Sequence, residues 1–117
     1  MKIKTSDLTG TALDWAVGYI MGEKLRILDR QIVWPEDYSP STDWAQGGPL
    51  VEREGFNRIV KNLSHGYTVS KKLAVLTEDA EDVRWVHGSG PTPLIAAMRC
   101  YVASQMGDEV EIPEELA

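Results

Sequence analysis

The segment Val83–Gly107, VRWVHGSGPTPLIAAMRCYVASQMG, contains both kinds of regular secondary structure and decides the fold class. Residues Val83–His87 alternate between two faces, which is typical of a β-strand. Thr92 followed by Pro93 favours a helix start, because threonine caps free N–H groups and proline fits the first helical position. Apolar residues then recur at helical spacing up to Gly107, which we expect to end the helix. The segment therefore predicts a strand followed by a helix, as in an α+β protein.

Towards the N-terminus the sequence predicts another strand and another helix. Met1–Lys4 favours a short strand, and from Leu8 onward the apolar residues form one helical stripe that should end near Gly22. Gly10 and Gly18 are weak helix formers within this stretch. Either these glycines permit close packing, or the helix begins later than Leu8.

Two further segments have the composition of strands. Leu25–Trp34 is rich in strand-forming residues around the polar centre Asp29–Gln31, where a turn would make the segment a hairpin that Pro35 ends. Tyr67–Leu76 predicts one strand or two short ones, and Glu78–Asp82 predicts an acidic turn after it.

The segments between these elements carry loop signals. Tyr38–Pro49, YSPSTDWAQGGP, is predicted to be a loop because it combines prolines, adjacent glycines and hydroxyl side chains. Trp85–Pro93 is predicted to contain a second loop. Leu50–Glu54 predicts a short helix, interrupted at Gly55, to which later apolar residues would add a face. These later residues are Phe56, Ile59, Val60 and Leu63.

Length and composition fit this arrangement. The chain has 117 residues, of which 43% are hydrophobic and 26% charged, an ordinary balance for one globular domain. We expect a small single α+β domain over residues 1–117, with two main helices packed on a short, mainly antiparallel sheet and with long ordered loops. The acidic tail Asp108–Ala117 is expected to be extended or frayed.

The charge and the apolar runs exclude several classes of function. A net charge of −6 argues against general binding to nucleic acid or to an anionic membrane, which relies on clustered lysine and arginine. The longest uncharged apolar run, Trp15–Met21, is far shorter than the roughly 20 residues of a membrane span. Met1–Lys4 lacks the apolar run of a signal peptide, and Cys100 is the single cysteine, so we expect a protein of a reducing cytoplasm.

Three long stretches of the chain resemble one family of phage proteins. KTSDLTGTALDWAV (residues 4–17), YSPSTDWAQGGPLVERE (residues 38–54) and GPTPLIAAMRCYVASQMGDEVEIPEEL (residues 90–116) are similar, in this order, to the NinX-like family of enterobacterial tailed phages and prophages. The resemblance covers roughly half of the chain, and residues 56–83 do not map onto the family pattern. It implies a phage accessory protein expressed in the host cytoplasm, and it carries over no reaction and no catalytic residue.

The first loop is the stronger candidate for a binding site. Aromatic faces can stack on a base or sugar, the carboxylate and amide can form directed hydrogen bonds, and glycines let backbone N–H groups approach a ligand. The alternative is an ordered surface loop in which Trp44 is a core anchor, Asp43 caps the following helix and Gly-Gly-Pro is a turn. The predicted ligand-binding residues of this loop are Tyr38, Ser41, Thr42, Asp43, Trp44, Gln46, Gly47 and Gly48.

The second loop leads into a helix N-terminus, where free N–H groups and the helix dipole favour an anion. Gly90 and Thr92 are its candidate residues, and His87 beside it can act as an acid, a base or a phosphate donor. The alternative for Thr92 is capping alone. Arg53 and Arg99 follow the two loops, and each guanidinium can hold a phosphate. Their alternatives are ion pairs, with a neighbouring glutamate for Arg53 and with the acidic tail for Arg99.

These features favour a protein that binds a small anionic, nucleotide-like ligand between the two loops without catalysis. The ligand could be a host immune signal that the phage sequesters. One alternative is a small hydrolase that uses His87 and Asp43, and another is an inhibitor that covers a host protein with Trp44 and the acidic tail. We expect no metal or other cofactor, because His87, Asp43 and His65 lack ligand-like spacing and Cys100 lies inside a helical stripe. We expect a homodimer or higher homo-oligomer.

Overall fold

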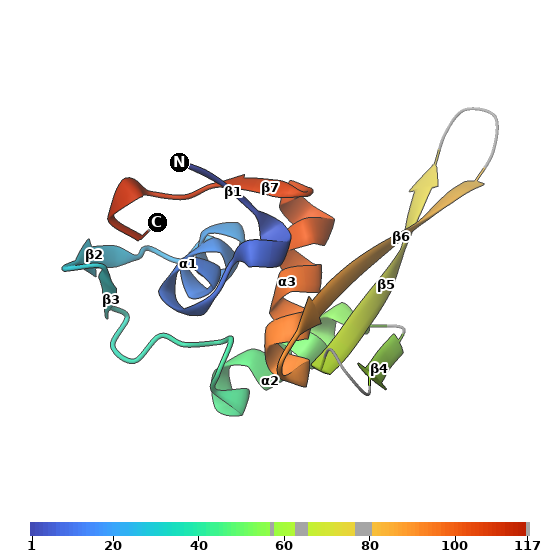
Figure 1. The fold of residues 1–117 in the computed structure, drawn as a ribbon, viewed down its shortest axis with the longest axis horizontal. Helices are drawn as coiled ribbons and strands as arrows, with labels where there is room; N and C mark the ends of the chain where they lie inside the picture. The colour runs from blue at the N-terminus through green and yellow to red at the C-terminus, as the bar shows by residue number, and fades with distance from the viewer. Residues whose placement is uncertain (57, 63–65, 77–80, 117) are drawn as a thin grey trace.

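The computed structural model of the chain describes residues 1–56, 58–62, 66–76 and 81–116 (Figure 1). It shows an α+β fold whose helices occupy the middle of the molecule and whose strands lie around them. In chain order the described elements are β1 (Lys2–Lys4), the 3₁₀ turn η1 (Thr5–Asp7), α1 (Gly10–Ile20), β2 (Arg26–Leu28), β3 (Gln31–Trp34), α2 (Trp44–Glu54), β4 (Arg58–Asn62), β5 (Gly66–Leu76), β6 (Glu81–Gly90), α3 (Pro93–Met106), β7 (Glu109–Glu111) and the 3₁₀ turn η2 (Glu114–Leu116).

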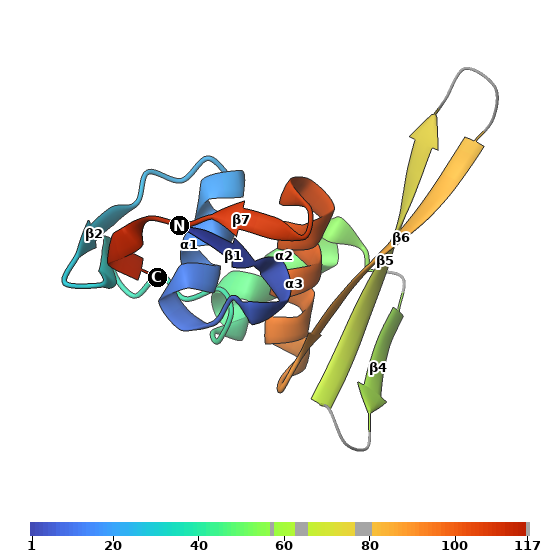
Figure 2. The same ribbon diagram turned by 45° about the horizontal axis from the view of Figure 1, so that its top comes forward.

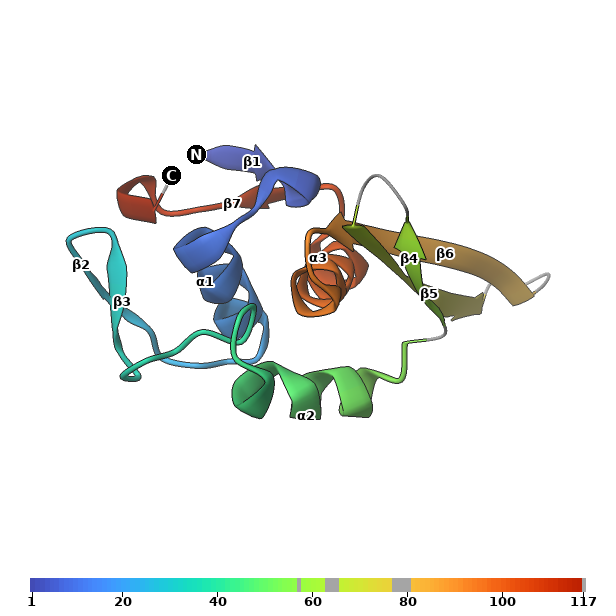
Figure 3. The ribbon, with the colours of Figure 1, turned by 60° about the horizontal axis from the view of Figure 1, so that its bottom comes forward.

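Helix α3 is the centre of the core. It lies between α1 and the sheet β4–β5–β6, with α2 crossing beside it (Figure 3). Because it has neighbours on several sides, α3 buries residues around most of its circumference, including Met98 and Tyr101. Burying one such large apolar side chain contributes roughly 1.5–3 kcal/mol, so this helix supplies a major part of the stability. The helix predicted from Pro93 to Gly107 is confirmed.

The described strands all pair antiparallel, as predicted. β1 pairs with β7, β2 with β3, and β4–β5–β6 form a three-stranded sheet. β5 and β6 continue past the helices as a projecting ribbon (Figure 2). Where β6 crosses α3, an added Cβ at Gly88 would lie 2.3 Å from the backbone nitrogen of Cys100, so glycine is required there. The predicted strand Tyr67–Leu76 is found as β5.

The N-terminal half largely follows its prediction. β1 is found, but α1 begins at Gly10 instead of Leu8, because Thr5–Asp7 form a separate turn and Thr9 occupies the N-cap position. Gly18 serves close packing, since an added Cβ would lie 2.8 Å from Leu25. Of the two alternatives raised for these glycines, close packing therefore holds at Gly18, and a later helix start holds at Gly10.

The segment Leu25–Trp34 is a hairpin, as the polar centre suggested. Strands β2 and β3 pair across a turn in which Asp29 and Arg30 have φ angles of 51° and 63°. Positive φ angles at both turn residues suit the right-handed twist of a two-residue hairpin. The bond between Trp34 and Pro35 is cis, and the strand ends there.

The prediction of a loop over Tyr38–Pro49 is wrong for its second half. Residues from Trp44 onward form α2, and Gly47, Gly48 and Pro49 lie inside this helix. Their weak helix propensity is overcome by tertiary packing, because the absence of a side chain at Gly47 lets α2 approach the carbonyl of Pro40 and the side chain of Leu94.

Two other assignments also differ from prediction. α2 ends at Gly55 in a left-handed conformation, but Ile59 and Val60 belong to strand β4 and do not extend a helical face. Leu63 lies outside the described residues. β6 continues from Trp85 through Gly90, so the second loop shrinks to Pro91 and Thr92 because β5 pairs with β6 up to that point.

The acidic segments at residues 78–82 and 108–117 complete the fold. Glu81 and Asp82 belong to β6, whereas residues 78–80 of the predicted turn lie outside the described part of the chain. The tail is extended, as one alternative held, and it is anchored because β7 pairs with β1. Within the described residues, none of the helices has the length and apolarity needed to cross a membrane.

Candidate functional site

The polar side chains of the first loop are used largely by the loop itself. The side-chain amide of Gln46 donates to the carbonyl of Asp37 at 2.6 Å and to Oδ2 of Asp43 at 3.0 Å, and its Oε1 accepts from the N–H of Ser39 at 2.9 Å. Asp43 Oδ1 also accepts from the N–H of Ala45 at 3.0 Å, which caps α2. The capping alternative for Asp43 is therefore confirmed, and Gln46 holds the turn before the helix closed.

Trp44, Gly48 and Thr42 lie on the outer side of this region. Trp44 is 54% exposed, so its alternative as a core anchor is wrong. An added Cβ at Gly48 would lie 3.7 Å from the Trp44 ring, an ordinary contact distance. Thr42 is exposed, and its N–H bonds to the carbonyl of Ser39 at 3.1 Å.

Ser41 is hydrogen-bonded to Asp14, a buried residue that was not predicted from the sequence as a site residue. The Ser41 N–H donates to Oδ1 of Asp14 at 2.8 Å, and the two residues are only 1% and 6% exposed. Burial raises the pKa of the Asp14 carboxyl above its ordinary value of 3.8, and the contacts with Ser41 offset part of this effect. An available signal was the position of Asp14 inside the apolar stripe of α1, next to Leu13 and Ala16.

A cavity of about 330 Å³ lies beside Asp14, between α1, β3 and the first loop. Tyr38 lines it, and burial, with smaller contributions from Glu23, Asp14 and Tyr101, raises the pKa of the Tyr38 phenol to about 12. The phenol thus stays protonated at neutral pH. The lining residues are Thr11, Asp14, Gln31, Ile32, Asp37, Tyr38 and Ser39.

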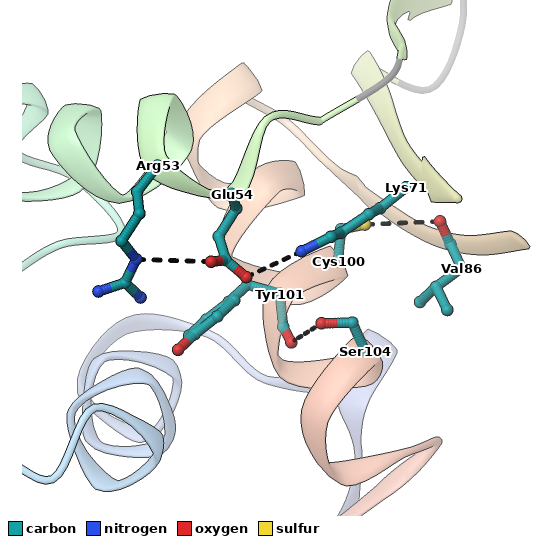
Figure 4. A network of polar contacts seen from close by, with 7 residues as sticks. All are labelled: Arg53, Glu54, Lys71, Val86, Cys100, Tyr101 and Ser104. Carbon is teal, nitrogen blue, oxygen red and sulfur yellow. Dashed lines mark hydrogen bonds and ion pairs between the residues drawn. The ribbon is translucent and has the colours of Figure 1, made fainter. Parts of the chain in front are cut away.

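Arg53 takes part in an ion-pair network at the end of α2 (Figure 4). Its Nε lies 3.5 Å from one carboxylate oxygen of Glu54, whose other oxygen lies 2.9 Å from Nζ of Lys71. The side chains of Glu54 and Lys71 are 14% and 17% exposed, whereas that of Arg53 is 57% exposed. The network connects α2 to β5, and Tyr101 lies beside Glu54 (Figure 4). The ion-pair alternative for Arg53 is confirmed.

A second cavity of about 300 Å³ contains His87 and Arg99. Its lining residues come from the β1–η1 segment, the end of β6, α3 and the start of β7. Its walls carry three basic side chains, several hydroxyl groups and two carboxylates. The lining residues are Lys4, Thr5, Ser6, His87, Gly88, Ser89, Arg99, Ala103, Asp108 and Glu109.

Arg99 is held rigidly in the wall of this cavity. Its Nε donates to the carbonyl of Leu8 at 2.8 Å, and Nη1 donates to the carbonyl of Ser89 at 2.6 Å. Desolvation lowers the pKa of the guanidinium, and the nearby Asp7 opposes this shift. A guanidinium has five N–H donors, so these two bonds fix its orientation and leave donors for a ligand. Arg99 thus bonds to these carbonyls and not, as the alternative to phosphate binding held, to the acidic tail.

His87 forms a close pair with a serine on the adjacent strand. Its Nδ1 lies 2.7 Å from Oγ of Ser70, which stands directly opposite in the β5–β6 register. Ser70 is 6% exposed, while His87 is exposed towards the cavity. Asp43 caps α2, so the carboxylate predicted to act with His87 is engaged on another element. The other histidine, His65, lies outside the described residues.

Gly90 and Thr92 have structural roles at the start of α3. The Thr92 hydroxyl accepts from the N–H of Ile95 at 3.1 Å, which confirms capping. An added Cβ at Gly90 would lie 2.8 Å from the Ile95 side chain, so Gly90 permits the close approach of β6 to α3. Thus His87 and Arg99 line one cavity and Tyr38 lines the other, and neither cavity combines the two predicted loops.

The geometry defines an α+β protein in which one cavity is lined by Lys4, His87 and Arg99 and another has only acidic residues among its charged lining. The chain belongs to the phage family described as "Bacteriophage P22, NinX", whose model matches residues 4–105. The match includes Lys4, His87 and Arg99, and ends before Asp108. The resemblance inferred from the sequence motifs is confirmed. No curated protein matches the chain.

Proposed function

We propose that this protein is a phage accessory protein that binds a small anionic, nucleotide-like ligand in the Arg99 cavity without transforming it. The observation that carries the proposal is the guanidinium of Arg99, which two backbone carbonyls orient in the cavity wall beside Lys4 and His87. A fixed guanidinium can bind a phosphate through paired hydrogen bonds at little further cost in conformational entropy.

The other lining residues suit a ligand that carries more than a phosphate. Ser6 and Ser89 supply hydroxyl groups, while Asp108 and Glu109 supply carboxylates that accept hydrogen bonds. An inorganic anion alone would gain nothing from these carboxylates. Sugar hydroxyls or the amino group of a base would use them. A volume of about 300 Å³ is at the lower end of the roughly 300–1,000 Å³ typical of small-molecule sites.

A direct test is to screen the purified protein against linear and cyclic nucleotides by thermal shift, and to measure affinities by calorimetry. We expect Arg99→Met to weaken binding by tenfold or more, because one charge-assisted contact contributes roughly 1.5–3 kcal/mol. Arg58→Met, which removes an exposed positive charge from β4, is the matched control and should bind as the parent does. Equal loss in both variants, or no nucleotide binding by the parent protein, would refute the proposal.

The pair formed by Ser70 and His87 supports a second candidate, a small hydrolase acting on a nucleotide-like substrate. At 2.7 Å, Nδ1 of His87 is within reach of the Ser70 hydroxyl, as a general base and nucleophile would be. To distinguish the binding protein from the hydrolase, the protein is incubated with the ligand, and the recovered ligand is analysed. Intact ligand supports binding alone, whereas turnover that His87→Ala abolishes while binding persists supports the hydrolase.

Exposed apolar residues support two proposals about partners. The β2–β3 hairpin exposes Leu28 (62%) and Trp34 (55%), which favours burial between copies in a homodimer or larger homo-oligomer. Trp44, the first residue of α2, is also exposed, and a protein-interaction inhibitor would need such an exposed aromatic side chain. Light scattering tests the first proposal, and co-purification of one stoichiometric host protein tests the second. Sequestration of a host immune signal in the cytoplasm is the biological role that ligand binding would serve.

A further inference from the structure

The cavity beside Asp14 is separate from the Arg99 cavity and has the opposite electrostatic character. Its charged lining residues, Asp14 and Asp37, are both acidic, and Glu23 lies close enough to influence Tyr38. A phosphate would be repelled here. A ligand of this cavity must therefore differ in charge from the ligand proposed for the Arg99 cavity.

Asp14 is a buried acidic residue whose hydrogen bond to Ser41 does not require an acidic side chain. One carboxylate oxygen accepts the Ser41 N–H at 2.8 Å, a bond that a neutral asparagine would form equally well. The side chain is 6% exposed and belongs to the same helix face as the buried residues Leu13 and Val17. Burial disfavours the ionised form of Asp14, and a positively charged partner in the cavity would favour it again.

The surroundings of Asp14 suit an ammonium group attached to a short carbon chain. An ammonium has three N–H donors, and Thr11, Gln31 and Tyr38 place oxygen acceptors in the same cavity walls as Asp14. The Ser41 hydroxyl, 1% exposed, contacts the Asp14 carboxyl from the protein side and is not among the residues that line the cavity. Ile32 provides an apolar wall against which methylene groups can pack.

We propose that this cavity is a binding site for a small organic amine, whose ammonium group is received by the Asp14 carboxylate. The remaining donors of the ammonium bind neighbouring hydroxyl and amide oxygens, and its carbon chain lies against Ile32. The volume of about 330 Å³ admits a molecule of a few carbon atoms with one or two amino groups. This site does not depend on ligand binding in the Arg99 cavity.

Putrescine and 1,4-butanediol form a matched pair of probes, because they share a four-carbon chain and differ in charge. Calorimetry at physiological ionic strength should show binding of putrescine and none of the diol. Asp14→Asn keeps the acceptor for the Ser41 N–H and removes the charge, so we expect it to weaken putrescine binding by at least about tenfold. Glu52→Gln removes an exposed negative charge from α2 and should leave the affinity unchanged.

The amide resonance of Ser41 reports the location directly, because its N–H bonds to Asp14. Putrescine should shift this resonance and leave that of Ser89, in the other cavity, in place. Tyr38→Phe is a second variant, which keeps the ring packed near Gly18 and should weaken binding several-fold. The proposal fails if putrescine does not bind, if the diol binds equally, or if Asp14→Asn and Glu52→Gln weaken binding to the same extent.

Discussion

Gly47 and Gly48 are adjacent in α2, yet we expect their substitution by alanine to have opposite effects on stability. In a helix interior, alanine is favoured over glycine by about 1 kcal/mol. At Gly48 the added methyl would make an ordinary contact at 3.7 Å with Trp44, so Gly48→Ala should stabilise the protein by up to about 1 kcal/mol. At Gly47 the methyl would lie 2.2 Å from the carbonyl oxygen of Pro40 and 2.7 Å from Leu94.

The contact at Gly47 involves the backbone and cannot be relieved by rotating a side chain. Overpacking of this kind typically costs about 1–3 kcal/mol, and here we expect the upper part of that range. After the gain in helix propensity, Gly47→Ala should be destabilised by about 1–2 kcal/mol. For a chain of 117 residues this corresponds to a fall in Tm of roughly 4–8 °C, against a rise of up to about 4 °C for Gly48→Ala.

Thermal unfolding followed by circular dichroism, with urea titrations of both variants, measures this difference. A Gly47→Ala variant as stable as Gly48→Ala would refute the packing argument. If that variant kept its Tm but lost ligand binding, Gly47 would instead serve the ligand approach that the sequence suggested. The two substitutions therefore separate a packing role from a binding role at the same motif.

Three further predictions concern one polar side chain at each of the helices α1, α2 and α3. Folding raises the pKa of Asp14, so the free energy of unfolding should fall as pH rises from about 3.9 through the folded pKa. Asp14→Asn should remove this fall, and it should be more stable than the parent protein at pH 7 but not at pH 3. Urea titrations at the two pH values measure this difference. Glu54→Gln leaves Lys71 without its carboxylate and should cost about 1–3 kcal/mol, whereas Glu52→Gln at an exposed site should stay within about 0.5 kcal/mol; chemical denaturation compares them. Thr92→Ala removes the cap of α3 and should cost about 1 kcal/mol, while Thr92→Ser should retain most of it; equal Tm values for the two would contradict the capping role.

Elements with strong local signals could be predicted from the sequence. Thr92 and Pro93 mark the start of α3 because capping and the proline φ angle act within a few residues. The hairpin β2–β3 was recognisable from its polar centre for the same reason. Of helix α2, only the second half, Leu50–Glu54, was predicted. Its first half was not, because the Gly-Gly-Pro motif resembles a turn, and only the approach of Pro40 and Leu94 explains Gly47.

The candidate sites were less predictable than the fold, because their walls come from distant segments. His87 and Arg99 were identified as candidates, but their neighbours Lys4 and Asp108 lie near opposite ends of the sequence. Asp14 was missed because a single carboxylate in an apolar stripe gives a weak signal. Its significance depends on burial and on the bond to Ser41, which no local pattern reveals.

The pairing of β1 with β7 has a consequence for how the protein is made. Thr5 bonds to the carbonyls of Gly107 and Asp108, at 2.7 and 2.8 Å, so the wall of the Arg99 cavity joins the beginning of the described chain to its end. During translation, α1 and most of the sheet emerge from the ribosome while this wall still lacks Asp108 and Glu109. A nascent chain that ends before Asp108 would therefore carry Arg99 without this part of the cavity wall, so the ligand binding proposed for the cavity would have to follow the synthesis of β7.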